Sequence, residues 1–370
     1  MSPIKFSCRK DDICSAISNV SKAVSPKSTI AALEGIRLKL SVDTLELTGY
    51  DLEIGITTEI ETESADAGEI VLNSRLFSEI TRRMPGDFIT YETDENLNMR
   101  ISCGSTEYHI SAISAEEYPV LPEVDRNRCI SLNQETLKSM INQTNYAVSL
   151  NDAKPILTGE LFDINEDGFN MVAIDGYRLA IRHENMNCGE KYHFVVPSKA
   201  LSEASRLLKE EAEEDCKIYV SDRHIMFEIN GYTIFTRLLE GEFHNYRSSV
   251  PVEYKTEVTV NTMDIVHSLE RCALLINEKN KAPIRCRFED SAIKISCRTG
   301  IGSIEDSIKC EISGENVIIG FNNKYLLDAL RSADTDKVKI QMTGSNRAVK
   351  IVPPQGDHFT AIVMPIQIKG

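Results

Sequence analysis

The stretch "MVAIDGYRLAI" (171–181) places Asp175 three residues before Arg178, between two apolar runs. A carboxylate and a guanidinium at this spacing could act as an acid–base pair, could close a tight turn between two strands, or could form part of a docking surface. Asp-Gly is also a frequent hairpin sequence, because both residues tolerate a positive φ. The residue types alone leave these three interpretations open, so the surrounding pattern has to decide between them.

Established motifs of catalytic and metal chemistry do not occur in the sequence. It contains no Gly-x-Ser-x-Gly, His-Glu-x-x-His, Gly-x-x-x-x-Gly-Lys or Gly-x-Gly-x-x-Gly, and the Gly-rich "TGIGSIEDS" (299–307) lacks a phosphate-loop lysine. The 7 histidines are scattered, and the 10 cysteines, Cys188 among them, include no Cys-x-x-Cys pair. This pattern predicts reduced, mostly buried thiols rather than a zinc site. We therefore expect no enzymatic activity, no metal and no cofactor.

The chain is acidic, with a formal net charge of −15. Such a chain repels nucleic acid on average, so binding to it requires a local concentration of cations. No apolar run reaches the length of a membrane span, and the strand-like start "MSPIKFSC" leaves no room for a targeting peptide. We expect a cytoplasmic protein without a membrane partner.

A repeat in three copies is the most informative feature of the sequence. When "NSRLFSEITRRM" (73–84) is set above "PSKALSEASRLL" (197–208), two serines, a glutamate and an arginine coincide without a gap. The same offset places Asp51 of "LTGYDLEIGI" on Asp175. A weaker third copy follows, with "FNNKYLLDALRS" (321–332) as its second helix. The turn at Asp175 is therefore one instance of a recurring unit.

Each copy has the pattern strand, helix, strands, helix, strands, with alternating apolar residues and Gly-containing turns in the strands. This predicts an α+β fold of three similar domains, 1–127, 128–252 and 253–370, with helices on one face of antiparallel sheets. The Pro-containing stretches "PVLPEVDRN" and "SSVPVEYK" are typical of the linkers between them.

The second helix of each copy carries two cations opposite its apolar stripe. At about 100° per residue, Phe77, Ile80 and Met84 share one helix face, and Arg75 and Arg82 lie nearly opposite it. The corresponding cations of the other two copies are Lys199 with Arg206 and Lys324 with Arg331. Cations on one helix usually only solvate its surface, but their recurrence in an acidic chain favours contact with a nucleic-acid backbone. Acidic residues interrupt each stripe, so this contact should be weak and sensitive to salt.

Along essentially its whole length the chain resembles the bacterial sliding clamp, the β subunit of DNA polymerase III. The segments that carry the match are "LTGYDLEIGI", "IVLNSRLFSEITRRMP", "AIDGYRLAI", "EGEFHNYRSSVP", "IGFNNKYLLDAL" and "AIVMPIQIKG". The resemblance implies a head-to-tail homodimer whose six domains close into a ring around duplex DNA, with helices lining the hole. It also implies a non-catalytic processivity factor that slides without sequence specificity and tethers replicative and repair polymerases and the clamp loader.

The resemblance also implies a hydrophobic peptide-binding groove, which the turn at Asp175 helps to form. The groove residues implied are Leu157, Ile174, Gly176, Tyr177, Arg178, Leu179, His244, Val363, Met364, Pro365 and Ile366. His244 stands where the family commonly has proline, and Ser248 and Ser249 replace a basic and an aliphatic residue. These departures bear on peptide preference. The variant Met364→Ala with Leu179→Ala is expected to release polymerase peptides without unfolding the protein.

Further positions are implied by the same resemblance. Lys27, in the loop "SPKST", matches a DNA-contacting position, and ring closure should bring the region of Ile110 against the region of Leu274 and Leu275. Two alternatives stay open at this point. One is a hydrolase or transferase whose residues meet only in space, and the other is a three-domain adaptor that binds proteins and no DNA.

Overall fold

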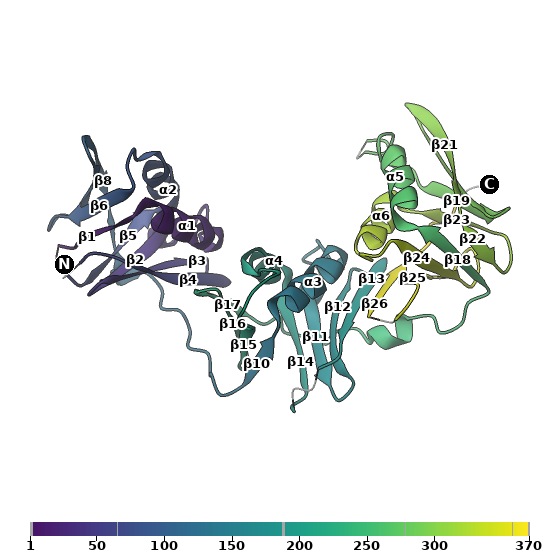
Figure 1. Cartoon of the computed structure of the whole chain (residues 1–370), viewed down its shortest axis with the longest axis horizontal. Coiled ribbons are helices and arrows are strands. Elements are labelled where there is room, and N and C mark those ends of the chain that lie inside the picture. Colours follow the sequence, from purple (N-terminus) through teal and green to yellow (C-terminus); the bar gives the residue numbers. More distant parts are fainter. Residues whose placement is uncertain (1–2, 65, 187–188, 278, 357, 369–370) are drawn as a thin grey trace. The chain divides into compact units, whose positions relative to one another are not determined.

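The computed structural model describes residues 3–64, 66–186, 189–277, 279–356 and 358–368 (Figure 1). The chain divides into two compact units, one of Met1–Leu137 with Glu203–Leu238, and the other of Lys138–Ser202 with Leu239–Gly370. Each unit contains one nine-stranded and one four-stranded sheet, and every strand pairing in the described part of the chain is antiparallel. None of the helices described is long and apolar enough to cross a membrane.

The first unit is built on a sheet that joins strands from two copies of the repeat. In order across the sheet these are β10 (Cys129–Leu132), β15 (Cys216–Val220), β16 (His224–Ile229), β17 (Tyr232–Arg237), β4 (Ile54–Glu61), β3 (Thr44–Tyr50), β2 (Gly35–Ser41), β5 (Gly68–Asn73) and β9 (Ile113–Ser114). The smaller sheet has the order β1 (Lys5–Arg9), β6 (Phe88–Thr93), β7 (Asn98–Cys103) and β8 (Thr106–Ser111). Strand β8 therefore lies at the edge of its sheet.

Two helices, α1 (Lys10–Val20) and α2 (Ser74–Arg83), pack beside one another and against strands of the large sheet (Figure 1). Helix α2 begins after Asn73, whose side chain accepts a hydrogen bond from Leu76 N at 3.1 Å and so caps the helix. Phe77, Ile80 and Met84 are buried, which confirms the predicted apolar stripe. The Phe77 ring meets Tyr91 of β6 edge-on at 5.8 Å, so the helix joins the large sheet to the small one.

Helices α3 (Gln134–Thr144) and α4 (Ser198–Leu207) each contribute residues to both units. The short 3₁₀ helices are η1 (Ser21–Ala23), η2 (Ala31–Glu34), η3 (Ala115–Glu117), η4 (Asn145–Ala147), η5 (Pro155–Thr158) and η6 (Tyr246–Ser249). In the second copy, the predicted stripe residues Leu201, Ala204 and Leu208 are buried, as are Leu326, Ala329 and Ala333 in the third copy.

The second unit repeats this design. Its large sheet has the order β14 (Tyr192–Pro197), β11 (Gly159–Asn165), β12 (Gly168–Ile174), β13 (Arg178–Glu184), β26 (Phe359–Val363), β25 (Val349–Val352), β24 (Lys337–Met342), β18 (Thr256–Asn261) and β22 (Glu311–Ser313). Its small sheet has the order β21 (Gly302–Lys309), β20 (Ala292–Thr299), β19 (Ile284–Glu289) and β23 (Val317–Phe321), which leaves β21 at an edge. Helices α5 (Thr262–Ala273) and α6 (Asn323–Arg331) pack against each other.

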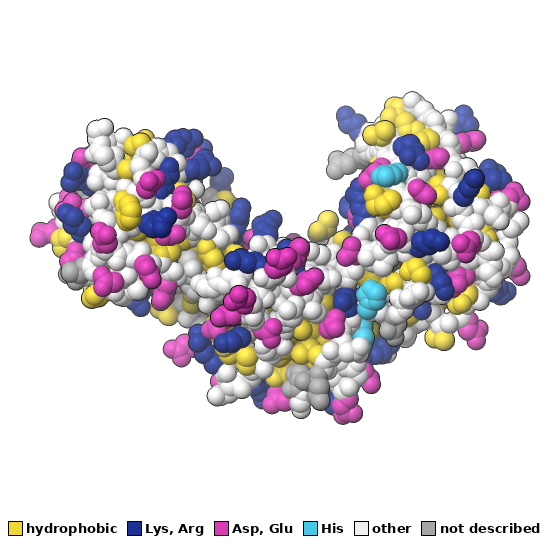
Figure 2. Space-filling model, in the orientation of Figure 1, with side chains coloured by type: hydrophobic (Ala, Val, Ile, Leu, Met, Phe, Trp, Pro, Cys, Tyr) yellow, Lys and Arg dark blue, Asp and Glu magenta, His cyan; other side chains and the backbone are white. Residues whose placement is uncertain are grey.

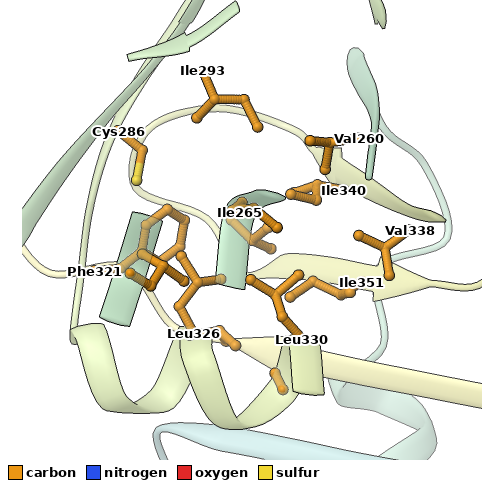
Figure 3. Packing of buried hydrophobic residues seen from close by; sticks show 14 of the residues in the cluster. Val260, Ile265, Cys286, Ile293, Phe321, Leu326, Leu330, Val338, Ile340 and Ile351 are labelled. Carbon is orange, nitrogen blue, oxygen red and sulfur yellow. The ribbon is translucent and has the colours of Figure 1, made fainter. Parts of the chain in front are cut away.

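The core of this unit shows how α6 is held. Its Leu326 and Leu330 point toward Ile265 of α5 and toward Val338 of β24, next to Phe321 (Figure 3). Asn322 caps the helix by accepting hydrogen bonds from Lys324 N at 3.0 Å and Tyr325 N at 3.4 Å. The buried apolar face fixes the rotation of the helix, which leaves Lys324 and Arg331 exposed.

The antiparallel α+β class predicted from the sequence is confirmed. Each nine-stranded sheet, however, crosses from one copy of the repeat to the next, through β17 with β4 in the first unit and β13 with β26 in the second. The compact units therefore do not coincide with the three copies, and the boundaries near 127 and 252 stay a prediction.

Among the described residues the cysteines are free thiols, and most are buried as predicted. Cys129 is exposed, while Cys14 and Cys310 are half-buried. Burial raises the pKa of Cys8 and Cys216 to about 12, so both stay protonated and unreactive. Cys188 lies outside the described residues.

Candidate functional site

The turn between β12 and β13 is closed by the side chain that the sequence singled out. Asp175 Oδ1 accepts hydrogen bonds from Tyr177 N at 2.9 Å and Arg178 N at 3.0 Å, and Asp175 N donates to Arg178 O at 3.2 Å. Gly176 has φ 91°, a conformation that residues with a side chain rarely adopt. Asp51 closes the equivalent turn in the first unit, with its Oδ1 accepting from Glu53 N and Ile54 N. The predicted tight turn is confirmed.

The Arg178 side chain is buried, and its charge is balanced by two carboxylates. Its Nε donates to Asp175 Oδ2 at 2.9 Å, and its Nη1 donates to Asp328 Oδ2 of α6 at 2.7 Å. The guanidinium also lies over the rings of Tyr325 at 4.5 Å and Tyr146 at 5.4 Å, where it makes cation–π contacts. The local ion pair expected from the sequence is therefore present, within a larger network that ties the turn to α6.

Two tyrosines form the rim above this guanidinium. The rings of Tyr177 and Tyr325 stack with centroids 6.3 Å apart, and the Tyr177 side chain is largely exposed. Burial raises the pKa of Tyr325, so its hydroxyl stays protonated at neutral pH. The rim thus offers aromatic surface with a polar edge, a combination that suits peptide recognition.

A pocket lies between this rim and the loop that follows η4. The residues that line it are Val148, Ser149, Leu150, Asn151, Ala153, Lys154, Leu157, Asp175, Gly176, Tyr177, Arg178, Asn322, Lys324 and Tyr325. Four of the predicted groove residues, Leu157, Gly176, Tyr177 and Arg178, therefore line one pocket. Sequence reasoning missed the wall from Val148 to Lys154. The largely exposed Leu150 was one available signal, as an isolated leucine in a polar loop.

Other predicted groove residues lie beneath the surface. Ile174 and Leu179 pack in a buried apolar cluster with Phe243 and Tyr246, and Leu157 borders it. Leu179 is only 2% exposed and Val363 is 0% exposed. They support the site from below, so Leu179→Ala would open a cavity in the core. Leu179→Ala should therefore lower stability as well as change the site, and the expectation that the double variant stays folded stays a prediction.

The segment after β26 is hydrogen-bonded to the Asp175 turn and to strand β23. Met364 N donates to Tyr177 O at 2.8 Å, and Ile366 N donates to Gly320 O at 2.8 Å. Met364 and Ile366 are about two-fifths exposed, and Pro365 is half-buried between them. This segment adds flexible apolar surface next to Tyr177.

His244 is exposed, and its Nε2 lies 3.1 Å from Ser249 Oγ. Two of the departures from the family pattern therefore contact each other. The neighbouring Tyr246 donates its hydroxyl to Asp163 Oδ2 at 2.6 Å, a carboxylate that also pairs with Arg247 at 2.8 Å. His244 does not line the pocket at the tyrosine rim.

The predicted DNA-contacting cations of α2, α4 and α6 are all exposed. Several have a carboxylate partner on or near the same helix, with N–O distances of 2.5–2.7 Å, namely Arg82 with Glu79, Arg206 with Glu203, Lys324 with Asp328 and Arg331 with Glu270. The hydrogen bond from Arg83 lowers the pKa of Glu79, which keeps that carboxylate charged. Figure 2 shows the same mixture of basic and acidic side chains on the visible surface of each unit.

Lys27 is an exposed loop residue, as the sequence implied. The loop is ordered by its own hydrogen bonds, with Ser25 Oγ donating to Lys27 O at 2.8 Å and Ser28 N donating to Glu34 Oε1 at 3.1 Å. Ser25 and Pro26 line a shallow pocket together with Arg75 of α2. The fold therefore brings this loop next to the first helix cation.

The residues implied in ring closure lie near two unpaired sheet edges. Ile110 is a half-buried residue of the edge strand β8, next to the exposed Tyr108. Leu274 and Leu275 do not lie within α5 but in the turn that ends it, where Leu275 N donates to Cys272 O at 3.1 Å. Leu274 is 80% exposed. Exposed apolar residues near an open strand edge are typical of protein interfaces.

Among the described residues, no group of three or more His, Cys, Asp or Glu side chains is placed to hold a metal ion. The features that stand out are instead an aromatic pocket beside a fixed turn, and three equivalent helices with exposed cations. Family models for the DNA polymerase III beta subunit match in the same order, the N-terminal domain over residues 4–122, the central domain over 131–245 and the C-terminal domain over 247–367.

The chain belongs to the DNA polymerase III β subunit family, the sliding clamps. It is 29% identical to the beta sliding clamp of Staphylococcus epidermidis over 98% of this chain and 99% of that protein. It superposes on the DNA polymerase sliding clamp of Bacillus subtilis with a TM-score of 0.94 and 30% identity over 100% of both chains. The sliding clamp of Pseudomonas aeruginosa bound to griselimycin is 26% identical, with a TM-score of 0.92 over 99% of this chain and 100% of that one.

Membership of this family makes the chain a processivity factor in DNA replication. The similarity extends over both units, so it includes the Asp175 turn and all three cation-bearing helices. The fold prediction of three clamp domains is confirmed by the three consecutive family matches.

Proposed function

We propose that two copies of this chain close head to tail into a ring around duplex DNA and slide along it without reading its sequence. The observation that carries the proposal is the recurrence of exposed cations on α2, α4 and α6, opposite buried apolar faces. The residues assigned to phosphate contact are Lys27, Arg75, Arg82, Lys199, Arg206, Lys324 and Arg331. Cations that recur at equivalent positions suit a regular polyanion such as a nucleic-acid backbone.

The carboxylates beside these cations fit a sliding contact. Arg82, Arg206 and Lys324 each pair with a carboxylate on the same helix. Each cation therefore gains little free energy when it exchanges this carboxylate for a DNA phosphate. Individual contacts are then weak and exchange quickly. A closed ring keeps its hold on DNA through topology, so weak contacts permit movement while the ring stays threaded.

The pocket at the Asp175 turn is proposed to bind short peptides from replicative and repair polymerases and from the clamp loader. Leu157 and the tyrosine rim supply its apolar lining, and Arg178 with Asp175 supplies the polar edge. The exposed Met364 adjoins Tyr177. An extended peptide with apolar side chains could fill this surface while its backbone meets the polar edge. A polymerase held in this way stays at high effective concentration near the primer end.

Ring closure is proposed to pair β8 of one copy with β21 of the other. Both strands lie at sheet edges, and exposed apolar side chains accompany each, Tyr108 on the first and Leu274 and Ile301 beside the second. Backbone pairing would satisfy both edges at once. In this proposal the chain acts without catalysis, in the cytoplasm where the bacterial chromosome lies.

Retention on DNA tests the ring directly. The protein is incubated with its clamp loader and with nicked circular or linear DNA, and bound protein is measured by gel filtration at moderate salt. We expect a dimer that stays on circles and is lost from linear ends. Equal retention on both forms would refute threading.

The role of the cations is tested by the triple charge reversal Arg82→Glu, Arg206→Glu and Arg331→Glu. A control with the same change in charge uses Arg126→Glu, Lys191→Glu and Lys337→Glu, exposed cations outside these helices. Polymerase stimulation should be lost only in the first variant, while both retain peptide binding. Unchanged stimulation would favour an adaptor that binds proteins and no DNA.

The peptide site is tested with exposed residues, because Leu179 is buried. Overlapping fluorescent peptides tiled across the DNA polymerase III subunits of the same organism identify the tightest ligand. Tyr177→Ala with Met364→Ala should weaken that ligand at least about tenfold, the effect of losing about 1.4 kcal/mol of contact. Leu150→Ala tests the wall that the sequence did not predict. Full affinity in all these variants would place the binding site elsewhere.

A further inference from the structure

Asp328 of α6 serves two cations with one oxygen atom. Its Oδ2 accepts from Lys324 Nζ at 2.6 Å and from Arg178 Nη1 at 2.7 Å. The two donors differ sharply in environment, since the Lys324 side chain is 70% exposed and the Arg178 side chain only 6%. One carboxylate therefore joins the exposed Lys324 ammonium to the buried Arg178 guanidinium, and both residues line the peptide pocket.

In α6 the carboxylate of the helix reaches a buried arginine at the start of β13. In α2 and α4 the equivalent acidic residues, Glu79 and Glu203, pair with a cation further along their own helix. In α6 the corresponding cation, Arg331, pairs instead with Glu270. Asp328 therefore pairs with Lys324, the first cation of its helix, and with Arg178 at the turn closed by Asp175. The third copy of the repeat thus connects its exposed face to the pocket.

We propose that contact of Lys324 with a DNA phosphate strengthens peptide binding at the Asp175 turn, with Asp328 as the link. A phosphate that draws the Lys324 ammonium away leaves the whole charge of Asp328 to Arg178. Charge-assisted hydrogen bonds of this kind strengthen when a competing donor is removed. The inference rests on the proposed function, because it joins the proposed DNA contact to the proposed peptide site.

The effect reaches the pocket through contacts that Arg178 already makes. The guanidinium lies against Tyr325, whose ring stacks on Tyr177, and it also holds Asp175, which closes the turn. A more tightly held Arg178 therefore fixes both the aromatic rim and the turn before a peptide arrives. Ordering a binding surface in advance lowers the entropy cost of binding.

The coupling must act equally in both directions. If duplex DNA raises peptide affinity by a given factor, bound peptide raises affinity for DNA by the same factor. A clamp occupied by a polymerase would then hold duplex DNA more firmly than an empty clamp. This difference in DNA affinity between peptide-bound and free clamps would not require any movement of the sheets.

The test measures affinity for the tightest tiled polymerase peptide by fluorescence anisotropy, with and without a short blunt duplex at low salt. In the unchanged protein the duplex should tighten peptide binding about fivefold, the lower end of usual coupling between sites. Lys324→Met removes the ammonium but keeps most of the stem. This variant should bind peptide at the tighter level without DNA and should show no further response.

Two further variants complete the test. Asp328→Asn should bind peptide more weakly than the unchanged protein and should not respond to the duplex. Lys337→Met removes an exposed cation of the same unit that pairs with Glu311 and is not assigned to phosphate contact, and it should retain the response. A Lys324→Met protein that still responds like the unchanged protein overturns the coupling, as does an unchanged protein that binds both ligands independently. Failure of every peptide to bind would instead remove the pocket function, and the coupling with it.

Discussion

The guanidinium carbon of Arg178 lies 4.5 Å from the ring centroid of Tyr325, although the two residues belong to different copies of the repeat. The same guanidinium is hydrogen-bonded to Asp175 and Asp328, so it joins β13 to helix α6. A planar group with several donors can make all these contacts at once, whereas an ammonium cannot. The arginine therefore supports the fold as well as forming part of the pocket.

Replacing Arg178 should accordingly lower stability. Arg178→Met leaves Asp175 without its cation and Asp328 with Lys324 alone, and we expect the free energy of unfolding to fall by about 3 kcal/mol or more. Arg178→Lys keeps the charge but loses the bridging geometry, which should cost about 1–3 kcal/mol. Urea denaturation monitored by circular dichroism measures both values. Equal stability of the lysine variant and the unchanged protein would contradict the bridging role.

The turn should be sensitive to a side chain at Gly176. No heavy atom outside its immediate chain neighbours lies within 4 Å of a Cβ built there, so steric crowding is not at issue, but φ is +91°. Gly176→Ala should therefore cost about 1–2 kcal/mol through backbone conformation alone. Gly344 has the same open surroundings without a left-handed φ, so Gly344→Ala is the matched control. A control variant as destabilised as Gly176→Ala would refute this explanation.

Glu160 of β11 is a carboxyl group that the fold keeps neutral. It is fully buried, and its Oε2 contacts Thr144 Oγ1, which also lies 2.8 Å from Met140 O. The single hydrogen of this hydroxyl can go to Met140 O or to Glu160 Oε2, while Glu160 Oε1 is buried without a hydrogen-bond partner among the described residues. Burial raises the pKa of Glu160 from 4.5 to about 8.

A pH dependence of stability follows from that raised pKa. As the pH rises from about 4.5 to about 8, the unfolded chain loses a proton that the folded chain retains. The free energy of unfolding should therefore fall by about 1.4 kcal/mol per pH unit in this window and level off above it. Glu160→Gln should remove this slope, whereas the exposed Glu166→Gln should keep it. Parallel slopes in both variants, measured by urea denaturation, would contradict a neutral Glu160.

Association of two chains should depend on Leu274. Because this side chain is 80% exposed, Leu274→Lys should leave the melting temperature unchanged while shifting the protein from dimer to monomer. Leu150→Lys changes a leucine that is 92% exposed and lies outside β8, β21 and the turn after α5, and it should leave the dimer intact. Light scattering coupled to gel filtration measures the mass. If the Leu274→Lys variant stays a dimer, the interface does not include the turn that ends α5.

The sequence predicted local features well, because local features depend on side chains close together in the chain. The turn at Asp175 depends on Asp, Gly and the next two amides, and the stripe of Phe77, Ile80 and Met84 depends on helical spacing. Both were found as predicted. The family resemblance then supplied the pocket region, since "AIDGYRLAI" identifies its turn.

Contacts between distant segments could not be derived in the same way. Asp328 meets Arg178 across 150 residues, and no pattern in either helix or strand indicates this partner. The pairing of β17 with β4 and of β13 with β26 uses backbone groups, which every residue carries. Leu179 and Val363 are buried because of those pairings. The sequence does not reveal the pairings, so sequence reasoning counted both residues as groove surface.

The pairing of β13 with β26 also has a consequence for biosynthesis. Strand β26 follows all other described strands in the chain, yet it completes the sheet next to the Asp175 turn. During translation this turn must wait for nearly the whole polypeptide to leave the ribosome before its neighbours are in place. A product that ended before β26 would lack the strand that pairs with β13, so the proposed peptide site would lose the support of that pairing.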